Sequence, residues 1–159
     1  MASEIWKGQA FAVSHSDDTG TVDGGFSGGL RAFFEYRNLG IDTATNGAYA
    51  ANVIRAVPSK HAEGDWHVHD LDFQMIYILQ GWVIFEYEGQ GEVTFRSGSA
   101  ALQPPGIRHR EIRHSDDLEL IEITSPAEFT TKVDPAPKKT LNAVRACSGP
   151  PKKAGVRRD

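Results

Sequence analysis

The stretch HVHDLDFQMIYILQG, residues 67–81, decides the fold of this chain. His67 and His69 are separated by one residue, so in a β-strand both side chains emerge on the same face, about 6.5–7 Å apart at Cα. Two imidazoles in that arrangement can converge on one metal ion. Gln74 opens a second strand after a short turn, and the five residues that follow it, MIYIL, are all apolar. We therefore expect both faces of this second strand to be covered.

Short strands separated by glycine turns continue on both sides of this stretch. Turn signals recur every 8–12 residues or so, about the spacing of all-β sandwiches and barrels. The expected strands are 30–39, 48–57, 66–69, 74–79, 82–88, 92–96, 100–103, 108–114 and 118–124. In strand 82–88, period-two alternation directs Val83, Phe85 and Tyr87 to the barrel interior and Glu86 to the other side. No long amphipathic helix is expected, and the predicted fold is a single all-β barrel domain.

The chain divides by composition into an N-terminal arm (1–29), a barrel (30–131) and a basic tail (132–159). The arm ends in the glycine-rich run DGGFSGGL. The tail holds eight Lys or Arg residues against two acids, and its Pro, Gly and like charges predict disorder. The rest of the chain holds nine basic residues against nineteen acids. Such an acidic body is repelled by phosphates, which argues against a nucleic-acid partner.

The composition also bears on the compartment. Cys147 is the one cysteine and has no partner for an internal disulfide, which favours a reducing compartment. The N-terminus lacks a basic start and a long apolar run, so no signal peptide is expected. No apolar stretch approaches the span of a bilayer. The sequence therefore predicts a soluble, cytoplasmic protein without a membrane partner.

A second pattern follows in GSAALQPPGIRH, residues 98–109, where glycines and a proline precede a histidine at fixed distances. Together with HVHDLDFQMIYILQG, and in this order, it resembles the paired motifs of the cupin superfamily over about residues 58–126. The resemblance implies a double-stranded β-helix (jelly-roll) barrel that holds one divalent metal ion. The ligands that it implies are His67, His69, Gln74 and His109. The other three histidines are expected on the surface: His15, His61 and His114.

Gln74 stands where cupins usually have a glutamate. It either ligates the ion directly or only hydrogen-bonds the strand or a bound water. Three imidazoles and a neutral amide leave the full double charge on the ion, which makes it a stronger Lewis acid and disfavours oxidative chemistry. Imidazole-rich sites accept Zn, Fe, Ni, Mn, Co or Cu. Resemblance to the cupins with three histidines and one glutamine implies ketonisation of unsaturated uronates or cyclisation of aromatic polyketides.

Three charged residues are candidates for catalysis. If His109 points inward, alternation brings Glu111 and Arg113 to the same face; if the strand leaves the barrel mouth there, both are solvated. Glu122 lies where the uronate-ketonising cupins carry an acid near the end of a similar strand. Those enzymes then have an arginine for the substrate carboxylate where this chain has Glu128, which counts against an acidic sugar.

The sequence thus predicts a metal-dependent enzyme that acts on a small oxygenated substrate. The reaction is of the isomerase, cyclase or lyase type, with the metal as Lewis acid and a carboxylate such as Glu122 moving a proton. One alternative is a three-histidine iron dioxygenase in which Gln74 does not ligate. Another is a non-catalytic cupin that binds a metal or a small molecule. Surplus apolar side chains in strands 30–39 and 74–79 predict a homodimer.

Overall fold

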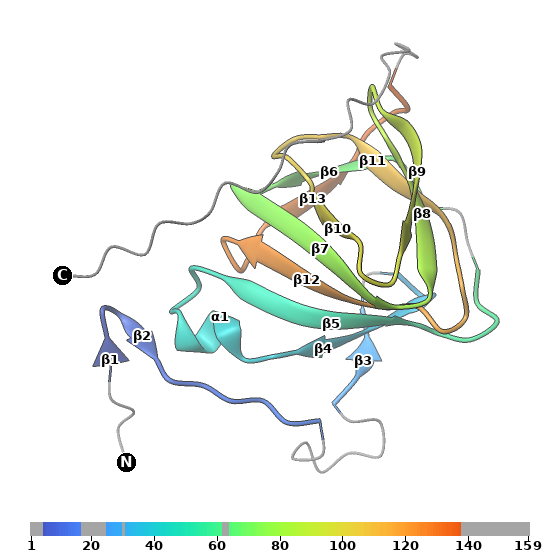
Figure 1. Ribbon diagram of the computed structural model, residues 1–159. Coiled ribbons are helices and arrows are strands. Elements are labelled where there is room, and N and C mark those ends of the chain that lie inside the picture. Colours follow the sequence, from blue (N-terminus) through green and yellow to red (C-terminus); the bar gives the residue numbers. More distant parts are fainter. Residues whose placement is uncertain (1–4, 17–24, 30, 62–63, 138–159) are drawn as a thin grey trace, which may run out of the picture.

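The computed structural model describes residues 5–16, 25–29, 31–61 and 64–137. Two antiparallel sheets form its barrel. Six strands form one sheet in the order β10-β7-β12-β5-β4-β3, and five form the other in the order β13-β6-β11-β8-β9 (Figure 1). The first sheet consists of β3 (Ser27–Gly28), β4 (Phe34–Asn38), β5 (Ala50–Ala56), β7 (Phe73–Gln80), β10 (Ala100–Leu102) and β12 (Glu119–Ser125). The second consists of β6 (His67–Asp70), β8 (Trp82–Tyr87), β9 (Gly91–Arg96), β11 (His109–His114) and β13 (Thr130–Val133). This arrangement confirms the predicted double-stranded β-helix.

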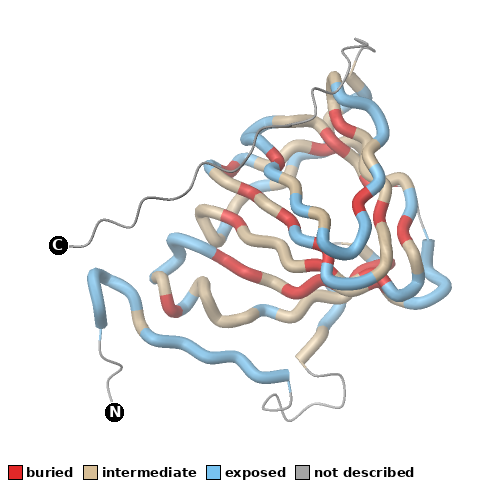
Figure 2. Tube along the Cα trace, viewed as in Figure 1, coloured by how far each residue is buried: buried red, intermediate tan, exposed pale blue. Residues whose placement is uncertain are grey.

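The core lies between the two sheets, where the apolar positions of alternating strands meet. Ile78, Val83 and Leu118 are almost completely buried there, and Tyr87 joins the same cluster. Phe85 packs against this cluster, so the predicted inward face of strand 82–88 is confirmed. Figure 2 shows the buried positions along the strands that enclose the interior.

Strand β7 is covered on one face only by the described residues. Ile76 and Ile78 point into the core, whereas the side chains between and after them, Tyr77 and Leu79, are 41% and 39% exposed. The expectation that both faces are covered is therefore not met within the described part of one chain. The outer face of β7 is an apolar surface open to solvent.

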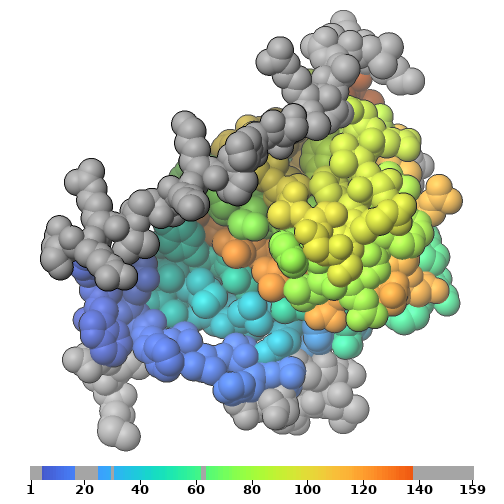
Figure 3. Space-filling model, in the orientation of Figure 1, coloured from blue at the N-terminus to red at the C-terminus, as the bar shows by residue number. Residues whose placement is uncertain are grey.

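The arm contains a separate two-stranded sheet, β1 (Ile5–Trp6) with β2 (Gln9–Ala10). The chain then runs beside the six-stranded sheet, where Arg37 of β4 donates to Ser14 Oγ at 3.0 Å. Figure 3 shows this blue segment lying against the cyan part of the chain. Strand β3 pairs with β4, so the end of the predicted arm belongs to the sheet.

At the other end, β13 pairs with β6 through Val133, two residues past the predicted barrel boundary at 131. The backbone N–H of Asp134 donates to the Trp66 carbonyl at 2.9 Å. The tail from residue 138 onward, where disorder is predicted, lies outside the described residues. The helix in the described part is α1 (Ile41–Ala44), and no described helix is long and apolar enough to span a membrane.

Candidate metal centre

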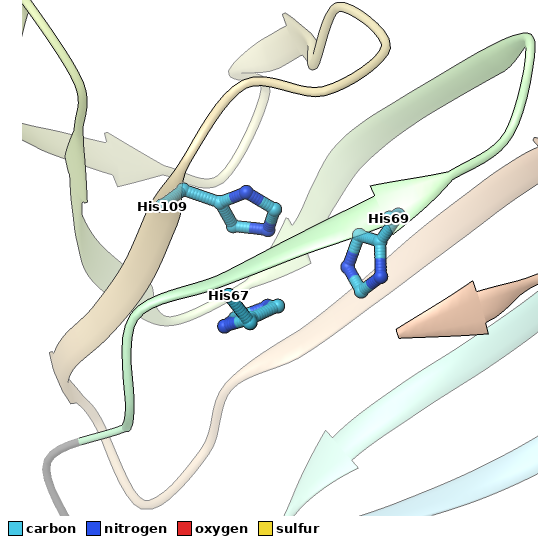
Figure 4. Close-up of side chains that lie close together, drawn as sticks. All are labelled: His67, His69 and His109. Atoms are coloured by element: carbon cyan, nitrogen blue, oxygen red, sulfur yellow. The ribbon is translucent and has the colours of Figure 1, made fainter. Parts of the chain in front are cut away.

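Three histidines from neighbouring strands form the centre of the site. His67 and His69 lie on β6 with one residue between them, and His109 opens β11 directly opposite His67. The nitrogens that can act as ligands in the three rings lie within 4.8 Å of one another. Figure 4 shows the three rings gathered beside β6 and β11. The two sequence motifs thus meet in space as their spacing predicts.

Hydrogen bonds at Nδ1 determine which ring nitrogen of each histidine is free to bind a metal ion. His67 Nδ1 lies 2.8 Å from the Asp65 carbonyl oxygen, and His109 Nδ1 lies 3.0 Å from the Ile107 carbonyl oxygen. A carbonyl oxygen only accepts, so both Nδ1 atoms carry the proton and both Nε2 atoms keep a lone pair. His69 Nδ1 lies 2.9 Å from Thr131 Oγ1, a hydroxyl that can donate or accept; when the hydroxyl accepts, His69 Nε2 keeps its lone pair as well. The donor set therefore suits a divalent ion bound through Nε2.

Burial keeps these imidazoles neutral. Burial, together with the neighbouring histidines, lowers the pKa of His69 to about 3 and that of His109 to about 4. Burial also lowers the pKa of His67. A neutral imidazole is the form that binds a metal, so the site is prepared for an ion at neutral pH.

Gln74 and Glu122 face each other across neighbouring strands, β7 and β12. Gln74 Nε2 donates to Glu122 Oε1 at 2.8 Å, and both side chains line the same cavity as the histidines. Because the amide nitrogen is engaged by Glu122, the amide oxygen is the atom that Gln74 has left for another partner. Burial raises the pKa of Glu122, while the hydrogen bond from Gln74 opposes this shift. Glu122 thus keeps its proton at a higher pH than an ordinary glutamate.

A β-bulge in β11 separates the two other candidates. Glu111 is 2% exposed and lines the cavity, but the register against β8 shifts between Glu111 and Arg113. Arg113 is therefore exposed and does not line the cavity. The shift turns His114 inward instead, where its Nδ1 is hydrogen-bonded to Glu111 Oε1. The predicted surface position of His114 is wrong because strict alternation ends at the bulge, whereas His61 is exposed as expected.

A cavity of about 280 Å³ between the two sheets contains this site. Its walls include two polar residues that sequence reasoning missed, Arg31 and Thr124. Thr124 Oγ1 is buried and has no hydrogen-bond partner among the described residues. Arg31 approaches His67 across 36 positions of the chain, and no local spacing marks such a contact. Thr124 does lie on the inward face of β12 with Glu122, so alternation alone indicates its direction.

Burial also raises the pKa of Glu111, against the lowering effect of its hydrogen bond to His114. Its Oε2 atom has no partner among the described residues. The cavity therefore contains two carboxyl groups, the buried Glu111 and the partly buried Glu122, beside three neutral imidazoles. Titratable groups with shifted pKa values in one enclosed cavity are typical of a functional site.

Comparison with known proteins agrees with this arrangement. Residues 54–124 match the cupin domain family, while no curated protein matches the sequence. The solved structure of KdgF from a Halomonas species is similar, with a TM-score of 0.57 and 19% identity over 72% of this chain and 94% of that one. An RmlC-like cupin from Shewanella frigidimarina has a TM-score of 0.56 and 21% identity, over 76% and 95% of the two chains.

A salicylate 1,2-dioxygenase from Pseudaminobacter salicylatoxidans is similar over 67% of this chain and 32% of its own, with a TM-score of 0.54 and 8% identity. Solved structures named as a decarboxylase, an isomerase and lyases also share the fold. At such identities the likeness shows the fold and leaves the reaction open. Residues 54–124, which match the cupin domain family, thus form most of a double-stranded β-helix that carries the cluster of three histidines.

Proposed function

We propose that this chain is a metal-dependent cupin enzyme that acts on a small oxygenated molecule by isomerase, cyclase or lyase chemistry. The observation that carries the proposal is the three-histidine cluster, with its Nε2 lone pairs kept available, in one cavity with the carboxyl of Glu122. The cavity is small, which favours a small substrate.

His67, His69 and His109 would hold the ion through Nε2, and the amide oxygen of Gln74 would be the fourth ligand. These four donors fit Zn, Fe, Ni, Mn, Co or Cu. When bound, the ion supplies a Lewis acid that polarises a carbonyl or enol oxygen. The carbonyl oxygens of Asp65 and Ile107 orient two of the rings, which limits the rearrangement that binding requires.

Glu122 would move the proton. Its carboxyl lies on the cavity wall, one hydrogen bond away from the proposed ligand Gln74. Burial raises its pKa, which lets the carboxyl hold a proton at a higher pH than an ordinary glutamate, as a general acid must. Glu111 of β11 is a second carboxyl that lines the same cavity, and its unpartnered Oε2 is available to a substrate. Arg113 is exposed and has no part in this proposal.

One observation favours a second candidate, the three-histidine dioxygenase. Gln74 is already engaged by Glu122, which is consistent with a site in which only the histidines ligate iron. A salicylate 1,2-dioxygenase is among the proteins that share the fold. Oxygen uptake by the iron-loaded protein, measured with small aromatic acids, separates this candidate from the first.

Elemental analysis and deuterium exchange test the proposal. We expect purified protein to hold close to one divalent ion per chain. In D₂O, the metal-loaded protein should catalyse exchange of the proton next to the carbonyl in a panel of small ketones and oxo acids. Glu122→Gln keeps the shape and the contact to Gln74 but removes the exchangeable carboxyl proton, so exchange should fall by about 10²–10⁴-fold. A metal-free purified protein, or full exchange by Glu122→Gln, would contradict the proposal.

A further inference from the structure

Arg31 brings a positive charge into a cavity whose other bases are neutral. Among the described residues that line the cavity, it is the one lysine or arginine. Its charge contributes to the lowered pKa values of His67, His69 and His109. The guanidinium contacts the ring of His67 and lines the same cavity as His69 and His109.

No carboxylate of the described residues forms an ion pair with Arg31, although the charge of Arg31 opposes the rise in the pKa of Glu111. The ion pairs of the described chain join other residues, and the polar contacts of the Arg31 side chain are to the ring of His67. Arg31 Nη2 lies 3.0 Å from Nδ1 and 3.3 Å from Nε2 of that ring. Since Nδ1 carries the proton for the Asp65 carbonyl, the Nε2 lone pair is the one acceptor that His67 offers to the guanidinium.

The chain makes room for the guanidinium at this place. Gly64 lies beside it, and a Cβ atom there would come within 3.1 Å of Arg31 Nη1. The same Cβ would lie 3.4 Å from the backbone N and O of Glu111 in β11. Gly64 N–H also donates to the Glu111 carbonyl at 2.9 Å, which fixes the glycine against β11. The guanidinium of Arg31 therefore lies between Gly64 and the ring of His67.

An ion bound at His67 Nε2 takes the lone pair that Arg31 uses. The guanidinium donors then need another acceptor, and a half-buried cation without one is costly. A carboxylate matches the planar fork of arginine with two parallel hydrogen bonds, and its single charge balances that of Arg31. A phosphate monoester would add a second negative charge beside Glu111 and Glu122, which line the same cavity.

We propose that Arg31 binds the carboxylate of the substrate, so that the enzyme takes small oxygenated carboxylic acids. This inference rests on the proposed function, because it places the carboxylate beside the metal site. The unpartnered, buried Thr124 Oγ1 is a second polar contact, suited to a hydroxyl or carbonyl oxygen of the same molecule. Phe85 and Phe129 give the cavity apolar walls for the carbon skeleton. The uronate-ketonising cupins have an arginine for the substrate carboxylate where this chain has Glu128. Arg31 would supply that positive charge from another part of the chain.

Ligand binding to the metal-loaded protein tests the role of Arg31. The probes are benzoate, its neutral isostere benzamide, and phenyl phosphate, each titrated by calorimetry. The wild type should bind benzoate about tenfold or more tightly than benzamide. Arg31→Gln should weaken benzoate about tenfold or more and leave benzamide unchanged, whereas Arg31→Lys should retain part of the preference. Arg96→Gln removes the same charge at an exposed position outside the cavity and should change neither affinity.

Each other outcome overturns the inference. Benzoate affinity that survives Arg31→Gln would show that the metal alone binds the carboxylate. Equal affinity of the wild type for benzoate and benzamide, no measurable binding of either, or tighter binding of phenyl phosphate would exclude the carboxylate site. Equal loss of both ligands in Arg31→Gln would show that Arg31 only maintains the structure of the cavity. Metal content is measured on each sample, so failure of the metal site is seen separately from failure of the carboxylate site.

Discussion

At the scale of single residues, the three histidines differ in the oxygen atom to which Nδ1 is hydrogen-bonded. His67 and His109 are oriented by backbone carbonyls, which no side-chain substitution removes. His69 is oriented by the hydroxyl of Thr131 on β13, a strand that lies beyond the sequence motifs. The geometry of the metal site therefore depends in part on a residue that lies outside both motifs.

This difference predicts a graded loss of metal. His69→Ala removes a ligand and should strip most of the ion during dialysis. Thr131→Val keeps the size of the side chain but removes the acceptor, so metal affinity should fall by about 10–100-fold. Thr130→Val changes the exposed neighbour on the same strand and should leave affinity unchanged. Competition with a chelator measures all three; full metal retention by His69→Ala would show that His69 is not a ligand.

Gln74→Glu should keep the ion but change the stability of the metal-free protein with pH. The substitution places a second carboxyl where the amide now donates to Glu122 at 2.8 Å. Two carboxyls at that distance share a proton, which raises their pKa in the folded state above that in the unfolded state. The folded protein then binds more protons, so the free energy of unfolding falls as the pH rises from about 5 to 8.

Denaturant unfolding of metal-free wild type and Gln74→Glu checks this sign. The variant should lose about 1–3 kcal/mol relative to wild type at the upper end of that range, and less at the lower end. A difference that does not change with pH would mean that the two side chains are not in contact. Metal content should be equal in the two proteins, because a carboxylate oxygen replaces an amide oxygen.

At the scale of elements, the strands could be predicted where the pattern is regular. The expected strand 92–96 corresponds to β9 and 118–124 to β12, each within one residue at both ends. The sequence failed at β11 because the bulge there depends on pairing with β8, which local alternation does not contain. It also missed β13, whose Thr-rich stretch has little apolar pattern and is held by pairing with β6.

The same division applies to the candidate site. His67, His69 and His109 could be predicted because motif spacing and strand alternation place them on one inward face. Arg31 could not, because its contact with His67 depends on where the chain after the arm crosses the barrel. Local pattern thus found the three clustered histidines, and the tertiary structure was needed for the residue that we propose to bind the substrate.

The end of β13 sets where the chain can be shortened. Truncation after residue 137 removes a segment of Pro, Gly and like charge, so the melting temperature should stay nearly unchanged. Truncation after Val133 also removes Asp134, which accepts from Arg108 at 2.7 Å and donates its N–H to Trp66. We expect this shorter protein to melt a few degrees lower. Thermal melting by circular dichroism compares the two; a large drop in the longer one would show that the tail packs on the protein.

At the scale of the whole molecule, one outer sheet face is apolar and is left exposed by the described residues. Leu102 of β10 is 63% exposed, and Tyr77 and Leu79 of the neighbouring strand β7 are also exposed. Cross-strand pairing continues the surface to Ile121 and Ile123 of β12, opposite Tyr77 and Met75. The arm adds further exposed apolar side chains, Ile5, Trp6, Phe11 and Val13. Contiguous apolar surface of this kind marks an interaction site.

We expect a second copy of the chain to cover this face, in a homodimer with two-fold symmetry. A flat sheet face is self-complementary about a two-fold axis, which is the commonest symmetric arrangement. The edge strand β10 also leaves backbone groups on one side unpaired by the sheet, and a second copy can shield them. The predicted dimer interface is therefore the outer face of β10, β7 and β12.

Light scattering at micromolar concentration checks this, and should give twice the 17.4 kDa mass of the chain. The double substitution Leu79→Glu and Leu102→Glu places two charges in the interface of each copy and should return the protein to a monomer. Val133→Glu adds a charge at an exposed apolar residue of the other sheet and should leave the dimer intact. A wild-type mass near that of one chain would show that the apolar face is not a dimer interface, because a two-fold contact of this size should persist at that concentration.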